Sequence, residues 1–146
     1  MTGNTATADE IRALIPHAGG MCLLERVLDW NDARIVLATA THRAVDNPLR
    51  RRGRVGAMHL CEYGAQAMAV HGGLLARAEG RRAAPGLLVS VRNVQFEVDR
   101  IDDLAGELTI VGERLLGSEA SWQYAFAVNH GDRLLASGRA AVLAVR

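Results

Sequence analysis

A histidine and a glutamate, far apart in the chain, are the residues whose types and surroundings could do acid–base chemistry. His17 follows a proline in the segment IPHAGG, directly before a predicted strand, and Glu62 is the only formal charge in the apolar run from Ala57 to Ala76. An imidazole with an unperturbed pKa of about 6.5 can act as a base near neutral pH. A carboxyl on an apolar helix has its pKa raised by desolvation and can act as an acid. We hypothesise that both groups belong to one site.

The run from Ala57 to Ala76 predicts one long, buried helix. Its apolar residues surround the helix axis instead of forming one stripe, which is typical of a helix covered on all sides. His59, Glu62 and Gln66 interrupt the run at spacings of three and four, so they share one narrow face. A structural explanation stays open, in which Glu62 pairs with a core group or faces water at a rim.

The elements around this helix predict an α+β fold. A short amphipathic helix or turn near Ile11 ends before Pro16, and residues 1–8 are expected to be frayed. Alternating apolar residues between turn signals predict six strands, at Met21 to Trp30, Arg34 to Thr41, Leu87 to Val98, Gly106 to Leu116, Ala120 to Asn129 and Arg133 to Val145. We expect an antiparallel sheet of about six strands wrapped around the central helix, in a single domain over residues 1–146.

Composition excludes several classes of protein. With 146 residues, 49% of them hydrophobic, the chain can form one real core. A net charge of +1 gives no nucleic-acid footprint, and Glu62 and Gln66 argue against a membrane span, so we expect a cytoplasmic protein. Cys22 and Cys61 have no partners at metal-ligand spacing and are expected to be reduced, with Cys61 a less favoured candidate for a catalytic thiol. No metal or cofactor is expected.

A cluster of arginines precedes the central helix. The loop VDNPLRRRGRVG carries Arg50, Arg51, Arg52 and Arg54. These residues could be ordinary solvated surface charge. Alternatively they could dock an anionic carrier, because the nearby helix N-terminus also favours negative charge.

Three segments carry a resemblance to a known family. IPHAGGMCLLERV resembles the first loop and strand of the 3-hydroxyacyl-[acyl-carrier-protein] dehydratases, EYGAQ resembles their central-helix segment, and VRNVQFEVDRIDDLAGELTI resembles a later strand, turn and strand. The resemblance implies the hotdog fold. Within that superfamily the chain is most similar to the dehydratase-like proteins encoded in aryl polyene and related lipid or polyketide clusters.

Dehydration of a 3-hydroxyacyl thioester, which we expect to be bound to a carrier protein, suits these residues. His17 would remove the C2 proton, and Glu62 would protonate the hydroxyl that leaves C3. Gln66 would orient Glu62, and the first N–H groups of the helix, at Gly56, Ala57 and Met58, would hold the thioester oxygen. Gly20, in a flexible loop, and His59 complete the expected pocket. The product would be a trans-2-enoyl thioester for fatty-acid or polyene-type biosynthesis.

The resemblance also implies that the site forms across a dimer interface, with His17 of one chain meeting Glu62 of its partner. That partner could be a second copy or another hotdog subunit. The loop before the helix lacks the His-Phe-Pro-Gly and Pro-Gly segments of the housekeeping dehydratases, and carries Gly53 and Gly56-Ala57 instead. Acyl-chain length, aryl or alkyl preference, and carrier protein or coenzyme A as donor therefore stay open.

Two other functions stay open. A hotdog thioesterase would use a carboxylate on the same helix with a water molecule, and a non-catalytic hotdog subunit would lend an acyl tunnel or stabilise a partner dehydratase. The thioesterase would not need a base at His17, and a non-catalytic subunit would not need to keep both His17 and Glu62. The pair therefore favours the dehydratase.

Overall fold

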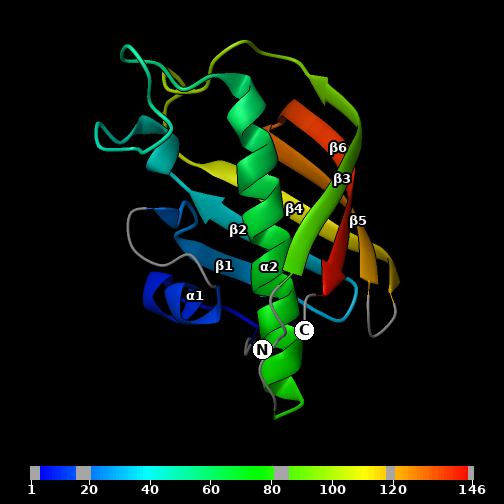
Figure 1. The fold of residues 1–146 in the computed structure, drawn as a ribbon. Helices are drawn as coiled ribbons and strands as arrows, with labels where there is room; N and C mark the ends of the chain where they lie inside the picture. The colour runs from blue at the N-terminus through cyan, green and yellow to red at the C-terminus, as the bar shows by residue number, and fades with distance from the viewer. Residues whose placement is uncertain (1–3, 16–20, 81–85, 118–120, 145–146) are drawn as a thin grey trace.

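The protein folds as one antiparallel sheet wrapped around a long helix (Figure 1). The computed structural model describes residues 4–15, 21–80, 86–117 and 121–144. Its elements are α1 (Ala8–Leu14), β1 (Arg26–Trp30), β2 (Arg34–Thr39), η2 (Thr41–Arg43), η3 (Ala57–His59), α2 (Leu60–Ala78), β3 (Gly86–Phe96), β4 (Leu108–Gly117), β5 (Ser121–His130) and β6 (Arg133–Ala144). The six strands lie in the order β1-β2-β4-β5-β6-β3, so β1 and β3 form the two edges.

The predicted helix is present as the 3-10 turn η3 followed by α2, and it ends two residues later than expected. The first predicted strand is shorter than expected, because strand pairing begins only at Arg26. Residues before Arg26 are held by side chains instead. The Leu23 N–H donates to the Gln66 side chain, and the Leu23 carbonyl accepts from the Thr39 hydroxyl. These contacts come from distant residues, so a local pattern cannot predict them.

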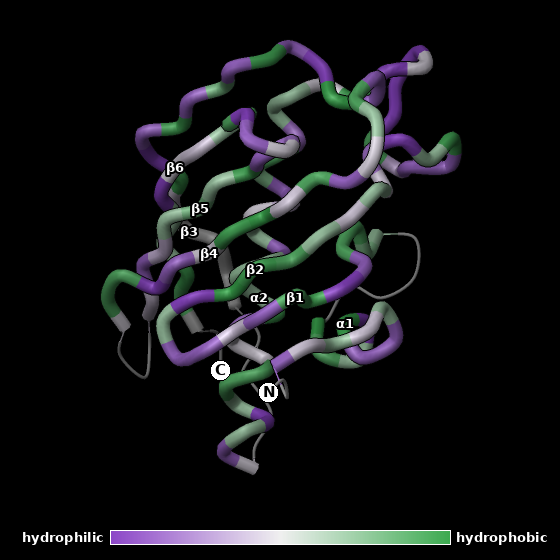
Figure 2. Tube along the Cα trace, turned by 180° about the vertical axis from the view of Figure 1, so that it is seen from behind, coloured by the Kyte–Doolittle hydropathy of each residue, from purple (hydrophilic) through white to green (hydrophobic). Residues whose placement is uncertain are grey.

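The main core lies between α2 and the half of the sheet that contains β1, β2 and β4. Its largest fully buried side chains are Tyr63, Ile11, Leu23, Leu24, Ile35, Leu37, Leu60, Leu74, Ile101, Leu108, Ile110 and Leu135. Viewed from behind, β2 and β4 are mainly hydrophobic, and hydrophilic residues gather in the loops at the ends of the sheet (Figure 2). Central strands that pack on a helix bury much of their surface, which accounts for this distribution.

A glycine allows α2 to lie against β5. A Cβ atom added to Gly64 would be 2.8 Å from ring atoms of Phe126, closer than real Cβ contacts. The helix and strand therefore approach more closely than any larger residue would permit. A smaller hydrophobic cluster follows along this side of α2, where Met68 packs with Tyr124 and Ala140.

The helix is not covered on all sides in the single chain, contrary to the expectation from its apolar sequence. Ala69 is exposed, and Cys61, Glu62, Ala65 and Gly72 are partly exposed along the same face. The sheet curls around only part of the helix circumference, so the described residues leave this face partly uncovered. In the described part of the chain, no helix has the length and apolar content needed to cross a membrane.

The expectation that residues 1–8 are frayed is wrong for Ala6 and Thr7. Ala6 is buried and forms a β-bridge with Val27, in which the Val27 N–H donates to the Ala6 carbonyl over 2.9 Å. Thr7 then caps α1 in a capping box with Glu10, which satisfies backbone N–H groups at the helix start. A segment of small polar residues is ordered here because it covers the free edge of β1.

Candidate functional site

Glu62 lies in the first turn of α2 and its side chain is partly buried. Its Oε2 atom accepts a hydrogen bond of 3.0 Å from Nε2 of Gln66, one turn further along the helix. The hydrogen bond predicted between these residues is thus present. Negative charge in the first turn is also favoured by the helix dipole. The carboxyl group is therefore held in one direction while part of its surface stays accessible.

Gln66 connects Glu62 to the backbone that follows the His17 loop. Gln66 is only 5% exposed, and its Nε2 also donates to the Met21 carbonyl over 2.7 Å. Its Oε1 accepts from the Leu23 N–H over 2.9 Å. Because the oxygen faces an N–H donor and the nitrogen faces two oxygen acceptors, only one orientation of the amide satisfies all three partners. Gln66 therefore fixes Glu62 and residues 21–23 relative to each other.

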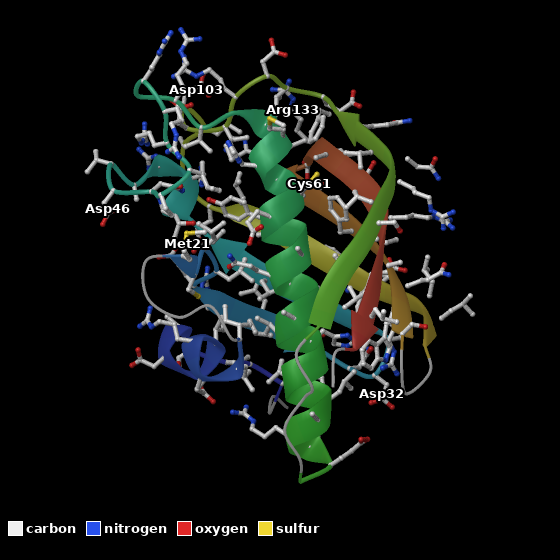
Figure 3. All side chains as sticks on the ribbon, viewed as in Figure 1. Met21, Asp32, Asp46, Cys61, Asp103 and Arg133 are labelled. Atoms are coloured by element: carbon white, nitrogen blue, oxygen red, sulfur yellow. The ribbon has the colours of Figure 1, made fainter. Side chains whose placement is uncertain are left out.

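His17 and Gly20 lie outside the described residues. In the sequence, His17 is four residues before Met21. The two sides of α2 differ in what they face. Met21 lies on the β2 side of the helix and Cys61 on the β6 side (Figure 3).

One of the three backbone donors expected to bind the thioester oxygen is already occupied. The Ala57 N–H donates to the Asp99 carbonyl over 2.9 Å, because Gly56 forms an antiparallel bridge with Arg100. Ala57 is therefore not available as an oxyanion donor, which corrects the sequence-based expectation. For the N–H groups of Gly56 and Met58, the described part of the chain provides no acceptor.

The bridge to Arg100 belongs to a cluster that fixes the loop before α2. The Val55 N–H donates to Oδ1 of Asp102 over 2.9 Å, and the Arg100 guanidinium forms an ion pair with the same carboxylate. The hydrogen bond from Arg100 lowers the pKa of Asp102 well below its usual range. These contacts hold the backbone at the start of η3 in place before any substrate binds.

The arginine cluster divides into two pairs with different roles. Arg50 donates to three loop carbonyls, those of Ala44, Gly53 and Arg43, over 2.8 to 3.2 Å. Arg51 donates to the carbonyls of Pro48 and Arg50 itself. The side chains of Arg52 and Arg54 are exposed and make no hydrogen bond or ion pair with the rest of the described chain. These last two guanidinium groups are therefore free of such contacts with the described chain and can meet a partner.

The remaining histidines have structural contacts, as expected. The buried His71 accepts at Nδ1 from the Tyr124 hydroxyl over 2.8 Å and donates at Nε2 to the Asn31 carbonyl over 2.7 Å. The buried His42 lies 2.9 Å from the Leu104 carbonyl. Burial lowers the pKa of both rings. The partly exposed His130 contacts the Ala105 carbonyl.

His59 and Cys61 complete the list of candidate side chains near Glu62. His59 is partly buried and makes no side-chain hydrogen bond within the described residues. Burial raises the pKa of the Cys61 thiol, so its reactive thiolate form is disfavoured. Among the described residues, no group of three His, Cys, Asp or Glu side chains has the arrangement of a metal site.

Comparison with known proteins decides the family. A family model described as ApeP-like, ApeP dehydratase, matches residues 9–146. The chain belongs to the ApeP-like dehydratase family. The predicted family and the dehydratase activity it implies are thus confirmed at this level. A search of curated proteins found no match for this ApeP-like chain.

Solved structures confirm the hotdog fold. The dehydratase heterocomplex ApeI:P from Xenorhabdus doucetiae is similar with a TM-score of 0.85 and 22% identity, over 97% of this chain and 92% of that chain. A hypothetical thioesterase protein from Streptococcus pneumoniae, solved with coenzyme A, is similar with a TM-score of 0.59 and 16% identity, over 82% of this chain and 84% of that chain. At these identities the likeness concerns the fold of the ApeP-like chain.

The sequence analysis missed the polar residues that surround the Leu23 carbonyl. Thr41 donates to this carbonyl over 2.6 Å. The hydroxyl of the buried Tyr63 forms hydrogen bonds with Thr41 and with the side-chain amide of the buried Asn47. One signal was present in the sequence, since Tyr63 is the only aromatic residue in the helical run and directly follows Glu62. A buried tyrosine usually needs a partner for its hydroxyl.

Proposed function

We propose that this chain converts a 3-hydroxyacyl thioester, bound to an acyl carrier protein, into the trans-2-enoyl thioester for fatty-acid or polyene-type biosynthesis. The supporting observation is the Gln66 side chain, which holds the Glu62 carboxyl and the carbonyl of Met21, four residues after His17. Dehydration needs a base and an acid on opposite ends of a two-carbon unit, and this link connects the proposed acid to backbone that is four residues from the proposed base in the sequence.

In the proposed reaction, His17 removes the C2 proton of the substrate. The electron pair of the C2–H bond forms the C2–C3 double bond, and the C3–O bond breaks as Glu62 gives its proton to the leaving hydroxyl. Water is released, His17 is left protonated and Glu62 ionised. Transfer of one proton from the imidazolium to the carboxylate, directly or through water, returns both groups to their starting states.

The backbone N–H groups of Gly56 and Met58 are proposed to hold the thioester oxygen while negative charge develops on it. They lie at the start of η3, where the helix dipole also favours negative charge. Donors of this kind contribute about 3 kcal/mol each in enzymes with an oxyanion hole. His59 and Gly20 are proposed to line the same pocket.

Arg52 and Arg54 are proposed to bind the acidic surface of the carrier protein. Both side chains are exposed and, unlike those of Arg50 and Arg51, make no hydrogen bond to the loop carbonyls of the described chain. Exposed guanidinium groups recognise carboxylates and the phosphate of a phosphopantetheine arm through paired N–H donors. Arg50 and Arg51 are proposed to support this loop and add positive charge to it.

A second hotdog subunit, identical or different, is proposed to cover the partly exposed face of α2. Among the described residues, β3 pairs only with β6 and forms an edge of the sheet, and its side chains Val91 and Phe96 are exposed. Free edges favour pairing with another strand. The ApeI:P structure is described as a dehydratase heterocomplex. That description favours one second candidate function, in which this chain supports a partner dehydratase.

One assay separates the proposed reaction from the alternatives. The protein is incubated with a 3-hydroxyacyl carrier-protein thioester, and the enoyl product and free thiol are both measured. We expect the enoyl product, with turnover reduced at least about 100-fold in His17→Ala and Glu62→Gln variants that still unfold cooperatively. Release of free thiol would indicate a thioesterase. A supporting subunit would give a different result. The wild-type protein would be active only with another hotdog chain present, and the His17→Ala and Glu62→Gln variants would then be fully active.

A further inference from the structure

We propose that Tyr63 is a positioning residue. It links the loop that carries Arg50, Arg51, Arg52 and Arg54 to the backbone at Leu23, which is hydrogen-bonded through Gln66 to Glu62. The inference rests on the proposed function for its catalytic meaning. Its structural basis is a continuous set of hydrogen bonds from Asn47, in the loop before Arg50, to the peptide groups of Leu23. None of these residues was expected to serve the reaction.

The hydrogen bonds run in a single direction. Oδ1 of Asn47 accepts from the Leu49 N–H, so its Nδ2 must be the group that donates to the Tyr63 hydroxyl oxygen over 3.2 Å. The Tyr63 hydroxyl then donates to Thr41 over 3.1 Å, and Thr41 donates to the Leu23 carbonyl over 2.6 Å. Aligned hydrogen bonds of this kind polarise and strengthen one another in a buried setting.

Burial makes the central hydroxyl dependent on these partners. Tyr63 is 0% exposed and Asn47 is 6% exposed. Burial raises the pKa of the Tyr63 hydroxyl, so it stays protonated and able to donate. Without the hydroxyl, Thr41 would lose its donor and the Asn47 amide would lose an acceptor that water cannot replace.

Leu23 joins this chain of hydrogen bonds to the candidate acid. Its carbonyl is held by the Thr41 and Thr39 hydroxyls, and its N–H donates to Gln66, which in turn donates to Glu62. Tyr63 and Gln66 are three residues apart on α2 and therefore share one helix face. The backbone at Leu23 is thus held between two side chains of the same helix.

The other end of this series of hydrogen bonds reaches the loop proposed to bind the carrier. The Asn47 carbonyl accepts from the Arg50 N–H over 3.0 Å, and its Nδ2 also donates to the Thr41 carbonyl over 2.8 Å. Asp46, next to Asn47, and Asp103 both lie at the end of the molecule where α2 begins (Figure 3). A carrier that bound Arg52 and Arg54 would therefore contact a loop connected through Tyr63 to Leu23.

Hydrogen exchange of the Leu23 amide, followed by NMR, tests the positioning role without requiring activity. In a Tyr63→Phe variant we expect this amide to exchange at least about fivefold faster, because one buried hydrogen bond has been lost from the set that holds Leu23. The matched control is Tyr124→Phe, which removes another buried hydroxyl, the one that donates to His71. That control should leave Leu23 exchange at the wild-type rate.

Kinetics with the carrier-bound substrate test the link to catalysis. We expect Tyr63→Phe to lower kcat by about fivefold and to leave KM unchanged, because the carrier surface itself is intact. If Tyr63→Phe fails to fold, Thr41→Val removes the next hydroxyl in the chain from a partly exposed position and carries the same expectations.

Each outcome bears on the proposal. Leu23 exchange that rises equally in Tyr63→Phe and Tyr124→Phe would overturn it, because the change would then reflect general loosening. Faster Leu23 exchange with unchanged kcat in an active enzyme would overturn the link to catalysis. If the wild-type protein forms no enoyl product, the proposed function fails, and the exchange measurement still decides whether Tyr63 positions Leu23.

Discussion

At the scale of single residues, the Gln66 amide explains how a carboxyl group can be directed from a partly open helix face. Its three hydrogen bonds join Glu62, on the same helix, to Met21 and Leu23, which are more than 40 residues away in the sequence. An apolar residue of the same size would leave a backbone N–H and a carbonyl without partners. The function of Glu62 and the local fold therefore depend on the same side chain.

Replacing Gln66 should reduce both activity and stability. We expect Gln66→Met to lower kcat/KM by about 10- to 100-fold, because Glu62 loses its orienting donor. The free energy of unfolding should fall by roughly 2–4 kcal/mol, because two buried backbone groups lose their partners. Enoyl formation and urea unfolding measure the two effects. Gln123→Met, at an exposed position on β5, serves as the control and should change neither. Unchanged kcat/KM in Gln66→Met would contradict the orienting role.

The two free arginines should affect binding of the carrier and leave the chemical step unchanged. We expect Arg52→Glu combined with Arg54→Glu to raise KM for a carrier-bound substrate by at least about tenfold, because two attractive contacts become repulsive. Turnover of a small thioester without a carrier should stay the same. Arg133→Glu combined with Arg139→Glu, two exposed positions on β6, provides a charge-matched control. An equal rise in KM with the control would mean that only net charge matters.

At the scale of elements, the contact between α2 and β5 makes a prediction that opposes helix propensity. Alanine is favoured over glycine in a helix by about 1 kcal/mol, yet Gly64→Ala would place its Cβ 2.8 Å from Phe126. We expect this change to destabilise the protein by about 1–3 kcal/mol in urea unfolding. Gly72→Ala, on the same helix with no atom within 4 Å of the added Cβ, should be neutral or stabilising. The opposite order of the two variants would show that helix propensity dominates.

The sequence predicted those elements whose patterns are local. The periodicity around Glu62 and the turn signals between strands gave the central helix, the six strands and the hydrogen bond from Gln66. The sequence could not predict features that depend on partners far away along the chain. Strand β1 begins late because Leu23 is held by side chains, and the Ala57 N–H is occupied because residues 99–101 pair with the loop before η3.

At the scale of the whole molecule, two buried histidines should make stability depend on pH. Burial lowers the pKa of His42 and His71 below the value of about 6.5 expected in the unfolded chain. The unfolded state therefore binds more protons as the pH falls below about 6.5, and the free energy of unfolding decreases there. Asp102, whose pKa is lowered, adds a further loss only below about pH 4.

Denaturant unfolding between pH 8 and pH 5 tests this expectation. The free energy of unfolding should be constant above about pH 7.5 and then fall with a slope of at most about 1.4 kcal/mol per pH unit for each histidine. A His71→Gln variant should show a smaller slope than the wild-type protein. A free energy of unfolding that stays flat down to pH 5 would contradict the assignment of both rings as buried neutral groups.

The assembly of the site can be decided by mixing inactive chains. The resemblance to the dehydratases implies that His17 of one chain meets Glu62 of another, whereas the Gln66 contacts join Glu62 to residues 21–23 of the same chain. Because the resemblance implies a pair formed between chains, we expect activity to return when a His17→Ala chain and a Glu62→Gln chain are co-expressed and purified together through two different tags. Each mixed dimer would then contain one site with both residues intact, and about half of the wild-type activity per dimer should return. If the pair lay within one chain, the mixed dimer would stay inactive. A mixed dimer of wild-type and doubly substituted chains provides the reference, since it should keep one working site only when the pair lies within a chain.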